Sequence, residues 1–132
     1  MGMVKMIKFV ELRTSIQTVL KAMHDRVFFQ VAPVAPDNVV FPYIVFDLPN
    51  SVDSGSLETF ILDVDVWDVA TDTTALETLI GTIDNALHQK SIMINDVMGF
   101  VIYRENRLTL VDDDPRIRRR KYIYQARTYQ KY

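Results

Sequence analysis

Three closely spaced aspartates come nearest to a metal site in this chain. Asp63 and Asp65 stand two residues apart in an alternating segment and therefore share one face of a strand, and Asp68 follows close by. Carboxylate oxygens so arranged could hold a hard cation. A metal nuclease would also place a lysine near them, and none lies between Arg26 and Lys90. We therefore interpret the aspartates as a solvated or interfacial acidic face and predict neither a metal nor a cofactor.

A basic and aromatic segment near residue 120 could contact phosphates or stack on bases. If the segment is a strand, Arg118 and Arg120 face one side while Arg119 and Lys121 face the other, so each face carries half of the charge. The sequence pI of about 5.6 is also well below that of a typical nucleic-acid-binding domain. We predict that the segment pairs with an acidic surface of another subunit, and we keep a small nucleic-acid-binding module as the alternative. Its members are Arg116, Arg118, Arg119, Arg120, Lys121, Tyr122 and Tyr124.

Catalytic groups do not assemble at any recognisable spacing. The chain has no cysteine, which excludes thiol nucleophiles, thiolate zinc sites and disulfides. His24 and His88 lack ligand-spaced partners and are interpreted as residues near helix C-termini, where the helix dipole favours a cation. We predict that the protein is not an enzyme.

The distribution of charge along the chain indicates assembly. Ten acidic residues and no lysine or arginine lie between Arg26 and Lys90, whereas residues 90–132 hold ten basic residues and five acids. An acidic surface of one copy could therefore meet a basic surface of the next, in a heterologous contact that closes into a ring or continues as a filament. Trp67 shares its strand face with the two aspartates and is the preferred aromatic anchor of such a contact.

Hydrophobic periodicity predicts the elements that position these groups. Apolar stripes at three- and four-residue spacing predict helices over about 5–24 and 73–88, the second starting with a capping box of Thr74 and Glu77. Alternating and β-branched segments predict a hairpin over 43–67 and a second one over 97–129. Residues 26–31 indicate a short extended piece.

The predicted order is therefore α-β-β-α-β-β. An α+β fold with a mainly antiparallel four-stranded sheet and both helices on one face is the simplest arrangement that buries both stripes. With 132 residues and 48% hydrophobic content, we expect a single domain over 1–132, with long loops at about 30–42 and 49–57 that become ordered on assembly. No apolar run approaches the ~20 residues that span a bilayer, so we expect a soluble protein without a membrane partner.

Several segments, taken in their order and spacing, resemble the tail-completion proteins of long-tailed bacteriophages, also called tail terminators or tail-to-head joining proteins. The likeness covers most of the chain. It lies in residues 26–33, in the Phe-Pro-Tyr and apolar run at 41–46, in the alternating acidic strand at 62–67 and in the aromatic strand at 122–129. None of these segments is a catalytic signature.

The resemblance implies a subunit of a hexameric ring that ends tail-tube growth and joins the tail to the head. Its implied partners are other copies of itself, the tail tube protein and the head connector or stopper protein, while DNA passes through without specific binding. The implied location is the head–tail junction of the virion, and the host cytoplasm during assembly. In such a ring, Asp112, Asp113 and Asp114 could line the lumen and keep DNA from adhering, although an ordinary solvated turn is the simpler interpretation.

Overall fold

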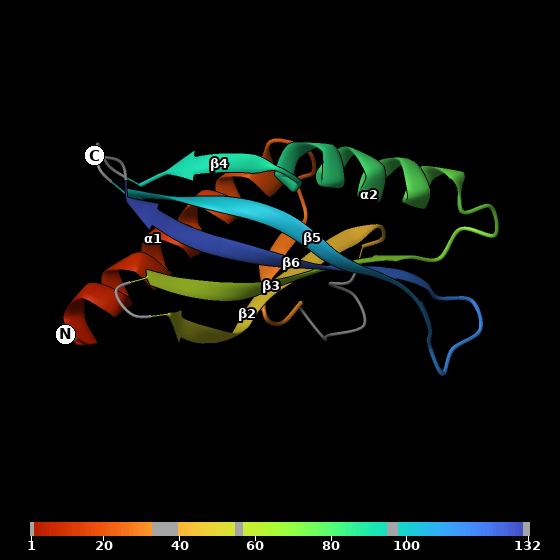
Figure 1. Cartoon of the computed structure of the whole chain (residues 1–132). Coiled ribbons are helices and arrows are strands. Elements are labelled where there is room, and N and C mark those ends of the chain that lie inside the picture. Colours follow the sequence, from red (N-terminus) through yellow and green to blue (C-terminus); the bar gives the residue numbers. More distant parts are fainter. Residues whose placement is uncertain (1, 33–39, 55–56, 95–97, 131–132) are drawn as a thin grey trace.

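The computed structural model describes residues 2–32, 40–54, 57–94 and 98–130 of the chain. Its first half contains helix α1 (Gly2–Lys21) and strands β1 (Val27–Phe29), β2 (Tyr43–Ser54) and β3 (Leu57–Asp68). Its second half contains helix α2 (Thr74–Leu87) and strands β4 (Lys90–Met93), β5 (Met98–Val111) and β6 (Arg118–Gln130). The strands form one curled sheet in the order β1-β2-β3-β6-β5-β4 (Figure 1). β1 pairs with β2 in parallel, and the other neighbours pair antiparallel.

This sheet corrects the predicted fold class. The sequence predicts four mainly antiparallel strands in the order α-β-β-α-β-β, whereas the structure has a six-stranded mixed sheet in the order α-β-β-β-α-β-β-β. The two additional strands are β1, with three residues, and β4, with four. The sequence indicated the extended piece at 26–31 that contains β1 but not its pairing in the sheet, and the four residues of β4 are too few for a detectable alternation. Both lie at the edges of the sheet, where short strands limit unwanted pairing with other chains.

The two predicted long loops have different outcomes. Instead of a loop over 49–57, β2 continues to Ser54 and β3 begins at Leu57, with a register irregularity between Asp47 and Asn50 next to Pro49. β1 pairs with β2 only as far as Phe46, so this part of β2 has no strand on its outer side among the described residues, and a bulge beside a proline is typical of such an edge because proline cannot donate to the ladder. Most of the loop predicted at 30–42 lies outside the described residues, since these omit 33–39.

Both helices pack against the same core. In Figure 1, α1 lies behind the sheet and α2 runs along its upper border. Their buried stripes and the inward residues of β2, β3, β5 and β6 form one cluster, which excludes water from one face of the sheet. The helices contribute Leu12, Ile16, Leu20, Leu76, Ile80, Ile83 and Leu87, and neither helix of the described ranges has the length and apolar character needed to cross a membrane.

Polar contacts fix α2 to the long β5–β6 hairpin. Asp84 accepts hydrogen bonds from the Arg104 guanidinium and, at 2.8 Å, from the hydroxyl of the fully buried Tyr124. His88, at the C-terminus of the helix, accepts the backbone N–H of Arg104 through Nδ1 at 2.9 Å. The Arg120 side chain on β6 pairs with Glu77 near the start of the same helix. The hairpin is therefore anchored along the length of α2.

Candidate functional site

The sheet face away from the helices carries a stack of aromatic and charged side chains. Tyr43, Trp67 and Arg119 are direct neighbours across β2, β3 and β6. The Tyr43 and Trp67 rings lie nearly parallel with centroids 5.7 Å apart, and the Arg119 guanidinium lies 3.9 Å from the Trp67 centroid, a cation–π contact. Arg119 also donates to Asp65 at 2.5 Å, and Lys121 lies 3.4 Å from Asp63. We call these six residues the sheet-face cluster.

Burial dominates the electrostatics of this cluster. It raises the pKa of Asp65 above the ordinary carboxyl value, although the hydrogen bond and positive charge of Arg119 act in the opposite direction. Burial also raises the pKa of Tyr43, with the nearby Asp65 charge adding to the effect. The ion pair is largely removed from water, with Asp65 12% exposed and Arg119 21% exposed. Desolvation therefore outweighs pairing for Asp65, and its charge opposes folding at neutral pH.

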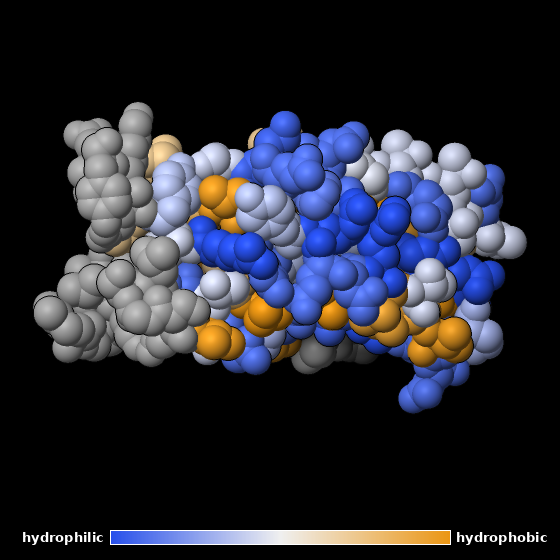
Figure 2. Space-filling view, viewed as in Figure 1, coloured by the Kyte–Doolittle hydropathy of each residue, from blue (hydrophilic) through white to orange (hydrophobic). Residues whose placement is uncertain are grey.

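Three buried polar atoms of the sheet-face cluster have no hydrogen-bond partner. They are Asp65 Oδ1, Trp67 Nε1 and Arg119 Nε. A buried donor or acceptor without a partner costs about 1–3 kcal/mol, so native proteins rarely keep several together. The cluster thus has two N–H donors and one carboxylate oxygen without partners, directly beneath an outer face of the sheet. Figure 2, in the view of Figure 1, shows hydrophilic side chains over the middle of this face and hydrophobic ones along its lower border.

The two charge blocks of the sequence meet inside one chain. Four ion pairs between described residues join the acidic segment 27–89 to the basic segment 90–132. They form because β6 lies between β3 and β5 and faces α2 on its inner side. These charges therefore already have partners within one chain, and the predicted pairing with another copy stays a prediction. The pairs are Asp63–Lys121, Asp65–Arg119, Glu77–Arg120 and Asp84–Arg104.

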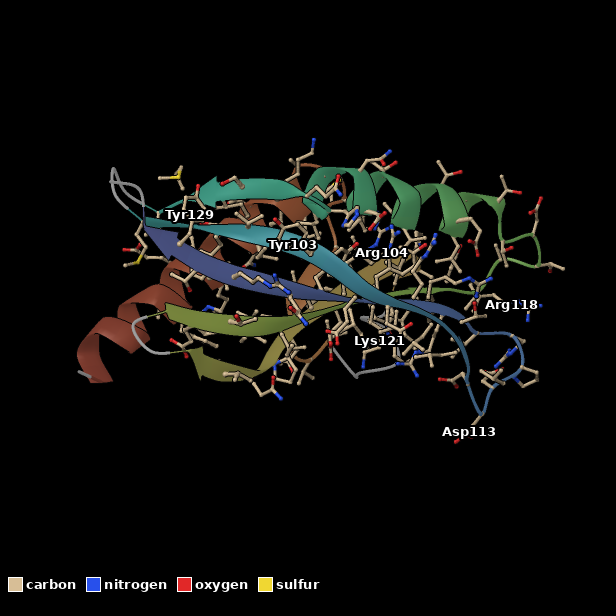
Figure 3. All side chains as sticks on the ribbon, in the orientation of Figure 1. Tyr103, Arg104, Asp113, Arg118, Lys121 and Tyr129 are labelled. Atoms are coloured by element: carbon tan, nitrogen blue, oxygen red, sulfur yellow. The ribbon has the colours of Figure 1, made fainter. Side chains whose placement is uncertain are left out.

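The turn between β5 and β6, residues 111–118, forms a preorganised hairpin tip. Asp112 accepts the backbone N–H of Asp114 at 3.0 Å, and the Asp114 carbonyl accepts the N–H of Ile117 at 3.0 Å. Arg116 binds the Asp114 carboxylate through two side-chain nitrogens, and its hydrogen bonds lower the pKa of that carboxyl to about 2. Asp113 lies at the far end of the hairpin in Figure 3. The tip therefore keeps its shape without a partner.

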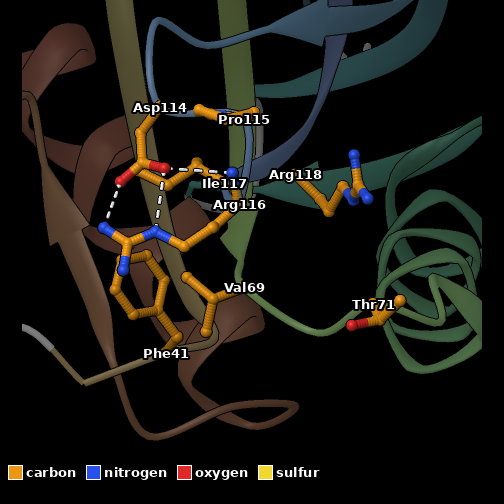
Figure 4. A pocket seen from close by; sticks show the side chains of 8 residues that line it. All are labelled: Phe41, Val69, Thr71, Asp114, Pro115, Arg116, Ile117 and Arg118. Atoms are coloured by element: carbon orange, nitrogen blue, oxygen red, sulfur yellow. Dashed lines mark hydrogen bonds and ion pairs between the residues drawn. The ribbon is translucent and has the colours of Figure 1, made fainter.

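A pocket of about 630 Å³ opens at the base of the hairpin tip (Figure 4). Phe41, Val69, Pro115 and Ile117 give it apolar walls, and Arg118 lies on the side of the pocket towards Thr71. Because Asp114 neutralises Arg116, Arg118 supplies the net positive charge of the lining. We call this the hairpin pocket. It is lined by Phe41, Val69, Thr71, Asp114, Pro115, Arg116, Ile117 and Arg118.

The structure distributes the residues singled out from the sequence over three places. Asp63, Asp65, Trp67, Arg119 and Lys121 come together in the sheet-face cluster, whereas Arg120 faces α2. Asp112, Asp113, Asp114, Arg116 and Arg118 belong to the hairpin tip. Within the described ranges, no three His, Cys, Asp or Glu side chains are grouped as metal ligands would be.

Sequence reasoning missed four residues of these sites. Tyr43 stacks on Trp67, and a correct hairpin register would have revealed the pair. Val111 is 93% exposed, and its signal was an apolar residue directly before a run of aspartates. Phe41 and Val69 meet at the hairpin pocket from separate segments, so no local pattern indicates their contact.

Comparison with known proteins gives one family. The family model described as "Tail completion protein gp17" matches residues 10–129, which extend from α1 to β6. No curated protein matches the sequence. Among solved structures, a chain of the "Virion of native gene transfer agent (GTA) particle" has a similar fold, with a TM-score of 0.62 and 13% sequence identity. The similarity covers 92% of this chain and 90% of that chain.

Proposed function

Because the chain belongs to the tail completion protein gp17 family, and so has a structural role in a phage tail, we propose that it closes into a ring on the end of the tail tube. The ring, a hexamer, ends tube growth and joins the tail to the head connector, and DNA passes through it without specific binding. The protein acts without catalysis, at the head–tail junction. The family match over residues 10–129 is the observation that carries this proposal, because it extends from within α1 through α2 and nearly to the end of β6.

The sheet-face cluster is the proposed docking surface for a neighbouring subunit or partner. Its unpartnered atoms on Asp65, Trp67 and Arg119 are closed to solvent, so they could bond to a second protein only if docking shifts the side chains around them; such bonds would offset the cost of leaving the atoms buried alone. Trp67 supplies a rigid aromatic anchor held between Tyr43 and Arg119. An interface of this kind would depend on fitted hydrogen bonds and ring contacts more than on long-range attraction between charges.

The hairpin tip is proposed to border the lumen of the ring. Asp113 is the carboxylate best placed to face passing DNA, because Arg116 neutralises Asp114 and Asp112 is engaged with the turn backbone. Negative charge on the wall would keep DNA from adhering during its exit. Replacing Asp113 by asparagine should slow DNA ejection without affecting ring formation. Unchanged ejection kinetics in infected cells would remove this part of the proposal.

Tail-tube growth provides the test of the proposed function. Purified tube protein polymerises in the presence of this protein, and tube lengths are measured by electron microscopy, beside a DNA mobility shift at two salt concentrations. We expect tubes to stop growing and to carry a ring at one end, with no DNA shift. A salt-sensitive DNA shift together with uncapped, growing tubes would instead favour the nucleic-acid-binding alternative.

A further inference from the structure

The hairpin carries a protruding apolar residue on one edge and a pocket on the other. Val111 ends β5 and is 93% exposed. Strand β4 pairs with β5 from Gly99 to Ile102, so the outer edge of β5 beyond that point has no strand beside it among the described residues. The hairpin pocket opens on the opposite edge, where β6 faces the segments of Phe41 and Val69 (Figure 4). Val111 does not line that pocket, although it pairs with Arg118 across the hairpin and lines a smaller adjoining pocket with it.

We propose that Val111 of one subunit inserts into the hairpin pocket of the next subunit, so that the hairpins lie side by side around the ring. This inference rests on the proposed ring and names the contact that closes it. Since the protruding residue and the pocket are different surfaces of one chain, the contact is heterologous. Each copy therefore binds the next in the same direction around the ring. Asp112 then lies against the Arg118 of the neighbouring copy, while Asp113 at the far end stays free to face the lumen.

Charge complementarity supports a second copy as the occupant. The tip presents Asp113 beside Val111, whereas the net charge of the hairpin pocket comes from Arg118, which also lines a smaller pocket with Asp112 of its own chain. Arg118 takes part in none of the ion pairs formed between described residues, and its Nε is buried without a partner. An acidic and apolar tip therefore meets an apolar pocket with an unpaired guanidinium. The tip supplies a carboxylate and an apolar side chain, and the pocket supplies a positive charge and apolar walls.

Preorganisation supports the tip as the inserting element. The hydrogen bonds of Asp112 and Asp114 hold the turn in shape before any contact forms. Little conformational entropy is therefore lost when the tip docks, and such rigid elements bind more tightly than floppy loops of the same area. The pocket volume of about 630 Å³ accommodates Val111 together with part of the adjoining turn.

The same substitution at three exposed valines tests the proposal. Val111→Asp removes the inserting residue, Val69→Asp places a carboxylate in the pocket, and Val52→Asp is the matched control on β2, away from both. These valines are 93%, 44% and 57% exposed, so each variant should fold, which circular dichroism and thermal melting would verify. Assembly is followed by sedimentation velocity and by negative-stain microscopy, alone and with tail tubes. We expect the first two variants to associate at least about tenfold more weakly than wild type, and the control to be unchanged.

Mixing the two defective variants gives the sharper result. The intact Val111 of the Val69→Asp protein can still enter the intact pocket of the Val111→Asp protein, and no further contact can follow. We expect heterodimers that never form rings. Normal rings from either variant alone, or a mixture that shows no dimer, would overturn the proposed contact. If the wild-type protein itself forms no ring even on tubes, the proposed function fails as well, which distinguishes the two failures.

Discussion

Asp84 links helix α2 to the hairpin, and replacing it by alanine should destabilise the protein strongly. Its carboxylate accepts hydrogen bonds from Arg104 and Tyr124, which lie on the two strands of the hairpin. The side chains of Asp84 and Arg104 are 15% and 25% exposed, and Tyr124 is fully buried. Alanine would leave a largely buried guanidinium and a buried hydroxyl without their acceptor.

The expected loss follows from these burial values. Breaking a buried ion pair by removing one partner costs about 3–5 kcal/mol, and partial exposure of Arg104 places this case at the lower end. Alanine is the better helix former, which returns a few tenths of a kcal/mol. The net loss is about 2–3 kcal/mol. With an unfolding entropy of about 2.1 cal/mol/K per residue over 132 residues, the Tm should fall by about 7–11 °C.

Thermal unfolding followed by circular dichroism measures this loss. Asn85→Ala is the matched control, because Asn85 is the adjacent, exposed residue of the same helix, and its Tm should stay within about 2 °C of wild type. Combining Asp84→Ala with Tyr124→Phe should cost less stability than the sum of the two single changes, because each change alone already removes the same hydrogen bond between the two side chains. A fall of less than about 3 °C for Asp84→Ala, or strict additivity in the cycle, would refute the assigned network.

Three further predictions concern the hairpin, the glycines and the sheet-face cluster. Burial and the adjoining carboxylate raise the pKa of Tyr124, so the folded state keeps a proton that the unfolded chain loses near pH 10. Stability should therefore fall more steeply above pH 10 in wild type than in Tyr124→Phe, and equal slopes in urea titrations would contradict this. Gly81→Ala should stabilise by about 0.5–1 kcal/mol, because a Cβ there meets nothing within 4 Å, whereas Gly99→Ala should cost about 1–3 kcal/mol, because its Cβ would lie 2.8 Å from a β4 carbonyl oxygen. If chemical denaturation showed Gly99→Ala to be more stable than Gly81→Ala, the packing described around these two glycines would be disproved. Trp67→Ala should lose about 2–3 kcal/mol through its ring stack and guanidinium contact, and the exposed Tyr103→Ala less than about 1 kcal/mol; similar losses would show that the cluster adds no stability.

The long elements could be predicted from the sequence because their buried residues recur at regular spacing. Leu12, Ile16 and Leu20 form the buried stripe of α1. The two strands of the last hairpin, β5 and β6, lie where alternating and β-branched residues predicted a hairpin. The start of α2 was predicted less well. Instead of a capping box of Thr74 and Glu77, the Asp72 carboxylate accepts both the N–H and the hydroxyl of Thr74, which a charged acceptor two residues upstream can do more strongly.

Distance along the chain misled the interpretation of charge. Asp65 and Arg119 lie in segments of opposite charge and are 54 residues apart, yet they form an ion pair because β3 and β6 are neighbours in the sheet. Strand order depends on the whole fold and cannot be inferred from local patterns. The alternation of Arg119 and Arg120 was nevertheless predicted correctly, since side chains of successive strand residues always face opposite sides.

A ring that caps a tail tube should be visible by cryo-electron microscopy of tube ends. Tubes assembled from pure tube protein are incubated with this protein at several concentrations, and the ends are imaged and averaged. We expect an additional ring of density on one end of each tube, with the hairpins bordering a central opening. Bare ends at every concentration, with this protein remaining monomeric in the same solution, would contradict it.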